Sequence, residues 1–274
     1  MKEKKLFDPG TILNSKKLII IVGNYGSGKT EVAVNLAIAL RSGGVRVRVA
    51  DLDIVNPYFR CREAMELMRV RDIGVVVPPG EQVSADLPIV VPEIAGMLAP
   101  QDGHVGIFDV GGDDVGARLL SSFAVALKKA AAEYSAPHYE LWQVINARRP
   151  FTDTVEGCLK MRRAIENASR LNVTGLIGNT HLMHETDAGT VYEGWELTRK
   201  VADASGLPIV FVTAMKGLEE IEELEDIDAP LFYLKRYMLP PWLAEETDNM
   251  TDSRFRDTLP APRSVPIGRP SGVR

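Results

Sequence analysis

The chain has 274 residues, of which 45% are hydrophobic and 25% are charged, and its formal net charge is −5. This length and composition predict a soluble globular protein that can bury a core of its own. The negative net charge excludes a global basic field, so we do not expect charge alone to draw the protein to nucleic acid or to an anionic lipid surface.

The two cysteines, Cys61 and Cys158, lie far apart in the sequence. This excludes a CxxC metal or redox motif and fits a reducing compartment, while a disulfide between the two remains open. The first apolar run, at 18–22, is too short to span a bilayer, and the residues before it lack the apolar stretch of a signal peptide. We therefore expect a cytoplasmic protein without a membrane segment.

Short apolar runs alternate along the chain with longer helical stretches, which is the pattern of repeated strand–helix units and a parallel sheet. Most of the runs are rich in Val and Ile and bare of charge, as central strands covered on both faces are. The predicted fold class is therefore α/β, a three-layer, open and mostly parallel sheet with helices on both faces. We expect strands at 18–22, 45–50, 75–77, 106–108, 141–145, 175–177 and 209–212, and helices at 31–41, 62–68, 117–132, 155–170, 191–204 and 218–224.

Three stretches fall outside this alternation. Residues 1–15 form an expected N-terminal extension, and residues 16–238 form the main domain. Within that domain, the proline-containing stretch 88–100 resembles an irregular insertion between strands. Residues 239–274 are rich in proline and poor in apolar residues, so this C-terminal tail cannot order itself unless it docks on something.

A glycine-rich segment lies between the first predicted strand and the first predicted helix. It satisfies the pattern G-x-x-x-x-G-K-[ST], whose backbone N–H groups surround the phosphates of a nucleoside triphosphate. Its glycines allow the close approach, and the start of the helix directs unpaired N–H groups at the same anion. We expect the lysine to contact the β- and γ-phosphates and the threonine hydroxyl to bind Mg²⁺. The segment consists of Gly23, Asn24, Tyr25, Gly26, Ser27, Gly28, Lys29 and Thr30.

Carboxylates follow two other predicted strands. We expect Asp109 to hold Mg²⁺ through water and Gly112 to bring its backbone N–H near the γ-phosphate, with a plain Asp-Gly turn as the alternative. Asp51 and Asp53 close the strand at 45–50, and strand ends gather at the ligand crevice of an open α/β sheet. One would orient the attacking water and the other would contact a metal-bound water. We favour Asp51 for the first role, and a helix N-cap is the alternative for Asp53.

These motifs, in this order, resemble the MinD/ParA/CobQ class of P-loop ATPases, whose fold is similar to that of the nitrogenase iron protein. The resemblance covers roughly residues 16–225. Members of this class commonly act as nucleotide-driven switches or assembly factors. The resemblance implies phosphate and Mg²⁺ contacts for Gly28, Lys29 and Thr30. It also implies that Asp51 lies near the water and Asp109 in the outer shell of the metal.

The same resemblance implies a position for the base. Members of the class often place an Asn at the end of a late strand to hydrogen-bond adenine, and Asn179 has that position here. The [NT]KxD motif of GTPases is absent, because Asn179 is followed by Thr180, His181 and Leu182. We therefore predict ATP, with GTP as the alternative. His181 and His184 are expected to be pocket-wall or surface residues rather than metal ligands.

Two departures limit what the resemblance implies. Many dimerising members carry a second lysine early in the loop that reaches the partner's nucleotide, whereas this chain has Asn24 there. The metal-cluster carriers of the class use a CxxC motif, which this sequence lacks. We therefore expect neither lysine catalysis in trans nor an iron–sulfur role, and a homodimer stays an open alternative.

The function predicted from the sequence is a slow, Mg²⁺-dependent ATPase with Lys29, Asp51 and Asp53 as catalytic residues. It would act as a switch or as an assembly or regulatory factor for an unidentified protein partner. The alternative is a small-molecule kinase or an ATP-dependent ligase, in which an aspartate acts as base and the insertion at 78–103 provides an acceptor pocket. A binding module without chemistry is disfavoured, because the lysine, the threonine and the aspartates are all present.

Overall fold

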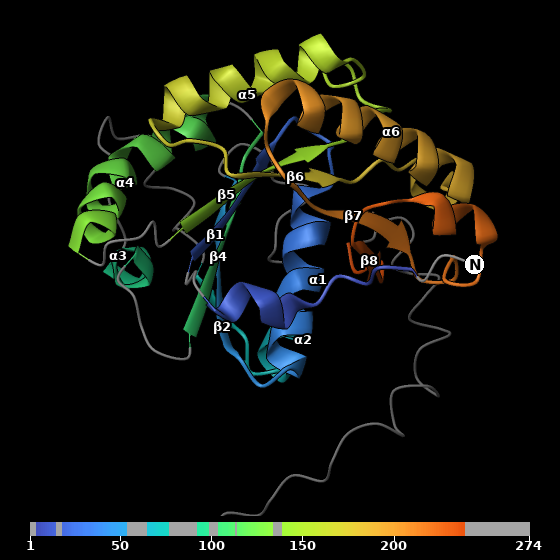
Figure 1. The fold of residues 1–274 in the computed structure, drawn as a ribbon. Coiled ribbons are helices and arrows are strands. Elements are labelled where there is room, and N and C mark those ends of the chain that lie inside the picture. Colours follow the sequence, from blue (N-terminus) through green and yellow to red (C-terminus); the bar gives the residue numbers. More distant parts are fainter. Residues whose placement is uncertain are drawn as a thin grey trace, which may run out of the picture. The chain divides into compact units, whose positions relative to one another are not determined.

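The structure is a computed structural model that describes residues 4–14, 18–53, 65–76, 92–98, 104–112, 114–133 and 139–238. They form an eight-stranded sheet with helices on both faces (Figure 1). The strand order is β3-β2-β4-β1-β5-β6-β7-β8, and each of the neighbouring pairs is parallel. The predicted α/β class is thus confirmed, and the described strands are parallel throughout.

The strands agree with the predicted runs to within a few residues, with one addition. They are β1 (Leu18–Gly23), β2 (Arg46–Leu52), β3 (Gly74–Val76), β4 (His104–Val110), β5 (Tyr139–Ile145), β6 (Gly175–Gly178), β7 (Ile209–Met215) and β8 (Leu231–Leu234). The helices are α1 (Lys29–Ser42), α2 (Met65–Val70), α3 (Pro92–Leu98), α4 (Asp114–Glu133), α5 (Val155–Ser169) and α6 (Ala188–Ser205). Three short 3₁₀ segments are η1 (Pro9–Asn14), η2 (Met183–Glu185) and η3 (Glu222–Asp226).

Strand β1 shows why its sequence is apolar without interruption. Ile19 and Ile21 face the core that α1 covers, whereas Leu18 and Ile20 face the core on the side of α4 and α5. Both faces are therefore buried, and no position on the strand tolerates a charge. Helix α1 is buried almost all round, as predicted, because it contacts β1, β2, β4 and β8.

The parallel register brings the strand ends to one edge of the sheet. Asp51 on β2 lies opposite Asp109 on β4, and Asp109 in turn lies opposite Ile21 on β1. The loop after β1 therefore begins beside both aspartates. This arrangement follows from parallel pairing, because the carboxyl ends of neighbouring strands then point the same way.

The N-terminal segment belongs to the same core. The ring of Phe7 lies 4.5 Å from that of Phe211 and 5.4 Å from that of Phe232, measured between centroids. The backbone N–H of Phe7 donates to the carbonyl of Leu231, which places the segment beside β8. Residues 4–14, expected to be an extension, thus pack on the sheet.

Two expectations of secondary structure were wrong, and one strand was not predicted. That strand is the short apolar run 231–234 after Pro230, and residues 92–98 of the supposed irregular insertion form α3. Residues 218–224 form successive turns leading into η3 instead of a helix. Their apolar side chains recur every three residues, at Leu218, Ile221 and Leu224, which matches the period of a 3₁₀ arrangement better than that of an α-helix.

Several predicted features lie outside the described residues, namely 78–91 and 99–103 of the insertion, the start of the helix expected at 62–68, and the tail 239–274. Among the helices that the structure describes, none combines the length and the apolar character needed to cross a membrane.

Removal of the Phe7 ring tests whether the N-terminal segment stabilises the domain. We expect Phe7→Ala to lower the free energy of unfolding by about 2–3 kcal/mol, because three aromatic rings lose a shared contact. Urea unfolding followed by circular dichroism measures the change. The control is Leu6→Ala, since Leu6 is 64% exposed and should shift stability by less than about 0.5 kcal/mol. Equal effects of the two variants would contradict the packing described.

Candidate nucleotide-binding site

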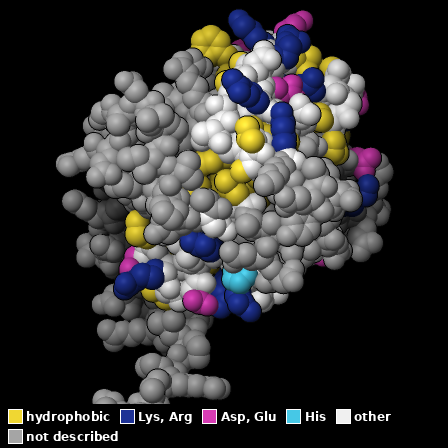
Figure 2. Space-filling view, turned by 90° about the vertical axis from the view of Figure 1, so that its left-hand side faces the viewer, with side chains coloured by type: hydrophobic (Ala, Val, Ile, Leu, Met, Phe, Trp, Pro, Cys, Tyr) yellow, Lys and Arg dark blue, Asp and Glu magenta, His cyan; other side chains and the backbone are white. Residues whose placement is uncertain are grey.

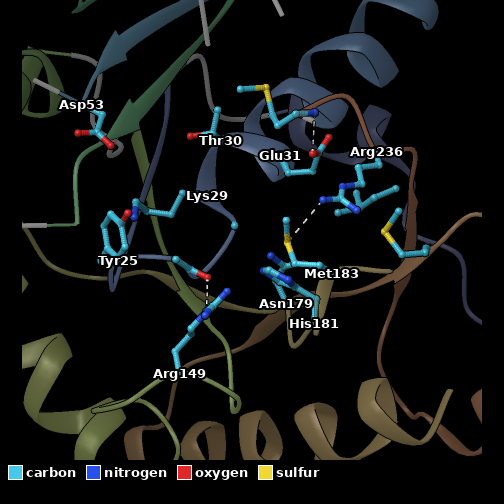
Figure 3. A pocket seen from close by; sticks show the side chains of 15 residues that line it. Tyr25, Lys29, Thr30, Glu31, Asp53, Arg149, Asn179, His181, Met183 and Arg236 are labelled. Carbon is cyan, nitrogen blue, oxygen red and sulfur yellow. Dashed lines mark hydrogen bonds between the residues drawn. The ribbon is translucent and has the colours of Figure 1, made fainter. Parts of the chain in front are cut away.

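A cavity of about 370 Å³ lies at the carboxyl edge of the sheet, beside the loop after β1 and the segment after β8 (Figure 3). Its polar end is lined by Lys29, Thr30 and Asp53. Its other end is apolar, lined by the side chains of Met183, Met215, Leu234 and Met238. A polar end beside a glycine-rich loop and an apolar end of this size match the two halves of a nucleotide, the phosphates and the base.

The loop reaches α1 through Gly28, which has a φ of +83° in the left-handed region. A Cβ atom on Gly28 would lie 2.3 Å from Nδ2 of Asn179, so only glycine fits. Within the described ranges, no side chain caps the N-terminus of α1, whereas Thr154 caps α5 and Asp187 caps α6. The start of α1 therefore has no side-chain cap from the described residues, and the helix dipole favours an anion there.

Two polar side chains lie on the inside of the loop. The Lys29 ammonium is buried and donates to the carbonyl of Asn24 at 3.0 Å. The Ser27 hydroxyl is fully buried and forms no hydrogen bond with a described residue. A buried polar atom without a protein partner is costly, and a phosphate oxygen would be a suitable partner.

The other predicted glycine, Gly112, lies against the loop from the outside. A Cβ atom on Gly112 would approach the backbone nitrogen of Tyr25 to 2.7 Å and the carbonyl carbon of Asn24 to 2.9 Å. The residues after β4 therefore directly contact the glycine-rich loop at 23–30, which is called the phosphate loop below. Whether the Gly112 N–H meets a γ-phosphate stays a prediction.

Thr30 and the two strand-end aspartates form a buried acidic centre next to the loop. The Thr30 hydroxyl donates to Oδ2 of Asp109 at 2.7 Å. Burial, and then repulsion by Asp51, raise the pKa of Asp109 to about 7, whereas the Thr30 hydrogen bond and Lys29 lower it. A divalent cation would relieve this repulsion, and a hydroxyl with nearby carboxylates is a donor set that suits Mg²⁺. The residues present thus fit the predicted metal.

Asn179, the predicted adenine contact, lines the cavity but also braces the loop. Its Nδ2 donates to the carbonyl of Ser27 at 2.6 Å, and its Oδ1 accepts from the hydroxyl of Thr213 at 2.5 Å. The side chain therefore connects the phosphate loop to β7. Its contact with a base stays a prediction.

No pattern in the sequence indicated the segment that closes the apolar end. Both carboxylate oxygens of Glu31 accept backbone N–H groups, from Tyr237 at 2.8 Å and from Met238 at 3.0 Å. Asn35 exchanges two hydrogen bonds with the backbone of Lys235. The first two turns of α1 thus hold residues 235–238 against the cavity, from about two hundred residues away in the chain.

Two basic side chains that sequence reasoning missed also line the cavity. They are Arg149, which follows β5, and Arg236, which follows β8 (Figure 3). Between them lies His181, and burial together with the charges of both arginines lowers its pKa to about 4. The prediction that His181 is a wall residue holds, and His184 is exposed. Within the described ranges, no three His, Cys, Asp or Glu side chains are grouped as a metal site would require.

No family model matches the chain, and no curated protein matches it in sequence. Its sheet is similar to solved structures of signal recognition particle proteins. The receptor FtsY from Elizabethkingia anophelis in complex with GDP is 16% identical, over 78% of this chain and 63% of that one, with a TM-score of 0.48. FtsY from Thermotoga maritima is 22% identical, over 74% and 64% of the two chains, with a TM-score of 0.49.

The 54 kDa signal recognition particle protein from Aeropyrum pernix K1, in complex with GDP, is 21% identical. The match covers 73% of this chain and 41% of that one, with a TM-score of 0.44. This chain thus spans less than two thirds of the length of each of the three proteins. Similarity at this level says nothing about nucleotide, partner or activity.

The fold class follows from the chain's own geometry. A glycine-rich loop joins β1 to α1, and Asp109 ends the neighbouring strand β4. The chain has a P-loop NTPase fold. The finer resemblance to the MinD/ParA/CobQ proteins, and the role of each site residue, stay predictions.

The environment of His181 predicts a pH dependence of stability. In the folded protein its imidazole stays neutral down to about pH 4, whereas in the unfolded chain it takes up a proton near pH 6.5. The unfolded state therefore binds more protons between these values, and falling pH destabilises the native state. Relative to His181→Gln, the wild type should lose roughly 1–3 kcal/mol of unfolding free energy between pH 7 and pH 4. Urea unfolding in EDTA measures this, and parallel pH curves for the two proteins would contradict it.

Proposed function

We propose that this protein binds ATP with Mg²⁺ in the cavity, hydrolyses it slowly, and acts as a nucleotide-driven switch or assembly factor for a partner protein. The observation that carries the proposal is the loop itself. Among the described residues, no side chain caps its helix start and none hydrogen-bonds the buried Ser27 hydroxyl, and Lys29 lies inside it. These are the groups that a phosphate chain would satisfy.

Mg²⁺ would be bound by the Thr30 hydroxyl, with Asp109 holding one of its waters. When bound, the ion neutralises negative charge on the phosphates. Asp51, on strand β2 next to β4, would then orient the attacking water. Asp53 lines the polar end of the same cavity. The second role of Asp53, on a metal-bound water, belongs to the same proposal.

Adenine is the base that the apolar end favours. Guanine presents two adjacent N–H donors that a free carboxylate would accept. The carboxylate nearest to this end, Glu31, is already engaged by two backbone N–H groups. Three methionines and a leucine leave a surface suited to a flat, weakly polar ring, and Asn179 would be the polar contact.

The switch role is supported by contacts between the loop and segments that a γ-phosphate would reach. Gly112, after β4, lies against the backbone of Asn24 and Tyr25, so displacement of the loop would be transmitted to it. The partner would be a protein, and a second copy of this chain is one candidate. On the face in Figure 2, basic and acidic side chains of the described residues are interspersed, which gives no support for a nucleic acid partner.

Nucleotide titration is the primary test. Calorimetry with ATP and with GTP, each with Mg²⁺, should show ATP binding by the wild type. In Lys29→Ala the affinity should fall by about 10-fold or more, because the loss of a charged hydrogen-bond partner costs about 1.5–3 kcal/mol. A preference for GTP would overturn the assignment of the base, and no binding of either nucleotide would overturn the proposed function.

The Thr30 hydroxyl provides a test of the metal site. Thr30→Val keeps the shape of the side chain but removes the hydroxyl, so the gain in ATP affinity on adding Mg²⁺ should largely disappear. Thr30→Ser is the matched control and should retain that gain, because it keeps the oxygen ligand. The affinity is measured by calorimetry with Mg²⁺ and again with EDTA. An unchanged Mg²⁺ effect in the valine variant would argue against Thr30 as a ligand.

Limited trypsin digestion tests the switch. If the segments around the loop respond to the γ-phosphate, the digestion pattern with a non-hydrolysable ATP analogue should differ from that with ADP. Lys29→Ala should give one pattern with both ligands. Identical patterns for the wild type would count against a switch and in favour of the kinase or ligase alternative, which an acceptor-dependent turnover would then support.

A further inference from the structure

The turn after β5 is attached to the phosphate loop at two points. The side chain of Asn24 donates to the carbonyl of Pro150 at 2.7 Å. The Nε–H of Arg149 donates to the carbonyl of Gly26 at 2.9 Å. Within the turn, the Thr152 hydroxyl donates to the Asn146 carbonyl and holds the turn closed. The turn therefore holds the Arg149 side chain on the phosphate loop.

The Arg149 guanidinium has few partners among the described residues. It forms no ion pair with a carboxylate in the part of the chain that the structure describes, and its remaining N–H groups make no hydrogen bond there. Its neighbour Arg148 is different, since it is exposed and pairs with Glu193 on the surface. Arginine presents five N–H donors in a planar fork suited to phosphate, and the described residues provide an acceptor for one of the five.

The charge of Arg149 acts inside the cavity. Its side chain lies in the cavity wall opposite Arg236, with His181 between them (Figure 3). The Nε2 atom of His181 is buried close to Gly28 of the loop and has no hydrogen-bond partner in the described part of the chain. The lowered pKa of this imidazole has Arg149 as a cause after burial. The charge of Arg149, beside a buried imidazole nitrogen that has no hydrogen-bond partner among the described residues, makes a site for an anion.

We infer that Arg149 is a phosphate-binding residue of this site, which supplies a second positive charge, besides Lys29, to the phosphate chain of the bound nucleotide from within the same chain. This inference rests on the proposed function. It also gives a role to Asn24, whose side chain holds the turn that carries Arg149. One chain would then contain the cationic groups that phosphate binding needs, without a residue from a second copy.

The test must separate the charge of Arg149 from its hydrogen bond to Gly26. Arg149→Gln keeps an N–H donor that can reach the Gly26 carbonyl but removes the charge. Arg149→Lys keeps the charge without the planar fork. Arg148→Gln, which removes the neighbouring exposed arginine, is the matched control. Each protein is titrated with ATP, ADP and AMP by calorimetry in the presence of Mg²⁺, and its thermal midpoint is recorded.

We expect Arg149→Gln to lower the affinity for ATP and ADP by roughly 10- to 100-fold, the range for hydrogen bonds to charged groups. Its affinity for AMP should change less, because AMP lacks most of the phosphate charge, and its thermal midpoint should match that of the wild type. The affinity of Arg149→Lys for ATP and ADP should lie between those of Arg149→Gln and the wild type. Arg148→Gln should bind all three ligands like the wild type. Raising the salt concentration should weaken ATP binding less in Arg149→Gln than in the wild type.

Two results would overturn the inference. One is an Arg149→Gln protein whose affinity for ATP is within twofold of that of the wild type. This would mean that Arg149 only stabilises the conformation of the loop. The other is an equal loss of affinity for ATP and AMP together with a lowered thermal midpoint, which would indicate local unfolding. Wild-type preference for GTP would contradict only the proposed base, and the same comparison made with GTP would still decide the role of Arg149. A wild type that binds none of these nucleotides, nor inorganic tripolyphosphate, would remove both proposals.

Discussion

The site depends on two carboxylates held side by side in the core. Asp51 and Asp109 are paired in register on neighbouring parallel strands, and both are buried at the same edge of the sheet. Burial, and then repulsion by Asp51, raise the pKa of Asp109, and Thr30 and Lys29 offset this only in part. A fold that buries such a pair beside a glycine-rich loop has a repulsion that a cation would relieve, and under the proposed function this would link the metal and the nucleotide to the neighbouring strands.

Polar side chains from distant segments hold the loop in its conformation. Asn179 donates to the Ser27 carbonyl, Arg149 to the Gly26 carbonyl, and Asn24 to the turn after β5. These hydrogen bonds connect the loop to the residue after β6, through it to β7, and to the turn after β5. Such bracing lowers the entropy cost of ordering the loop around an anion, which is the benefit of a preorganised site.

The opposite end of the cavity is closed by a different kind of contact. Helix α1 begins at the phosphate loop, and its Glu31 and Asn35 hold the backbone of residues 235–238. The segment that lines the apolar end is therefore bound to the helix that also begins the phosphate site. A displacement of α1 along its axis would change both ends of the cavity together, because the same helix contacts each of them.

The amino-acid sequence by itself determined the α/β class, most strands and the phosphate loop. These depend on local patterns: apolar runs buried on both faces, helical periodicity, and glycines at fixed spacing before Lys29. It also indicated that Asp51 and Asp109 end strands that meet at one edge. Only the tertiary structure decided that Phe7 joins the core, that 218–224 is not a helix, and that Glu31, Arg149 and Arg236 line the cavity. The contacts of Phe7, Arg149 and Glu31 join residues that are about one hundred to two hundred positions apart in the chain. No local pattern encodes which distant residue such a side chain will contact.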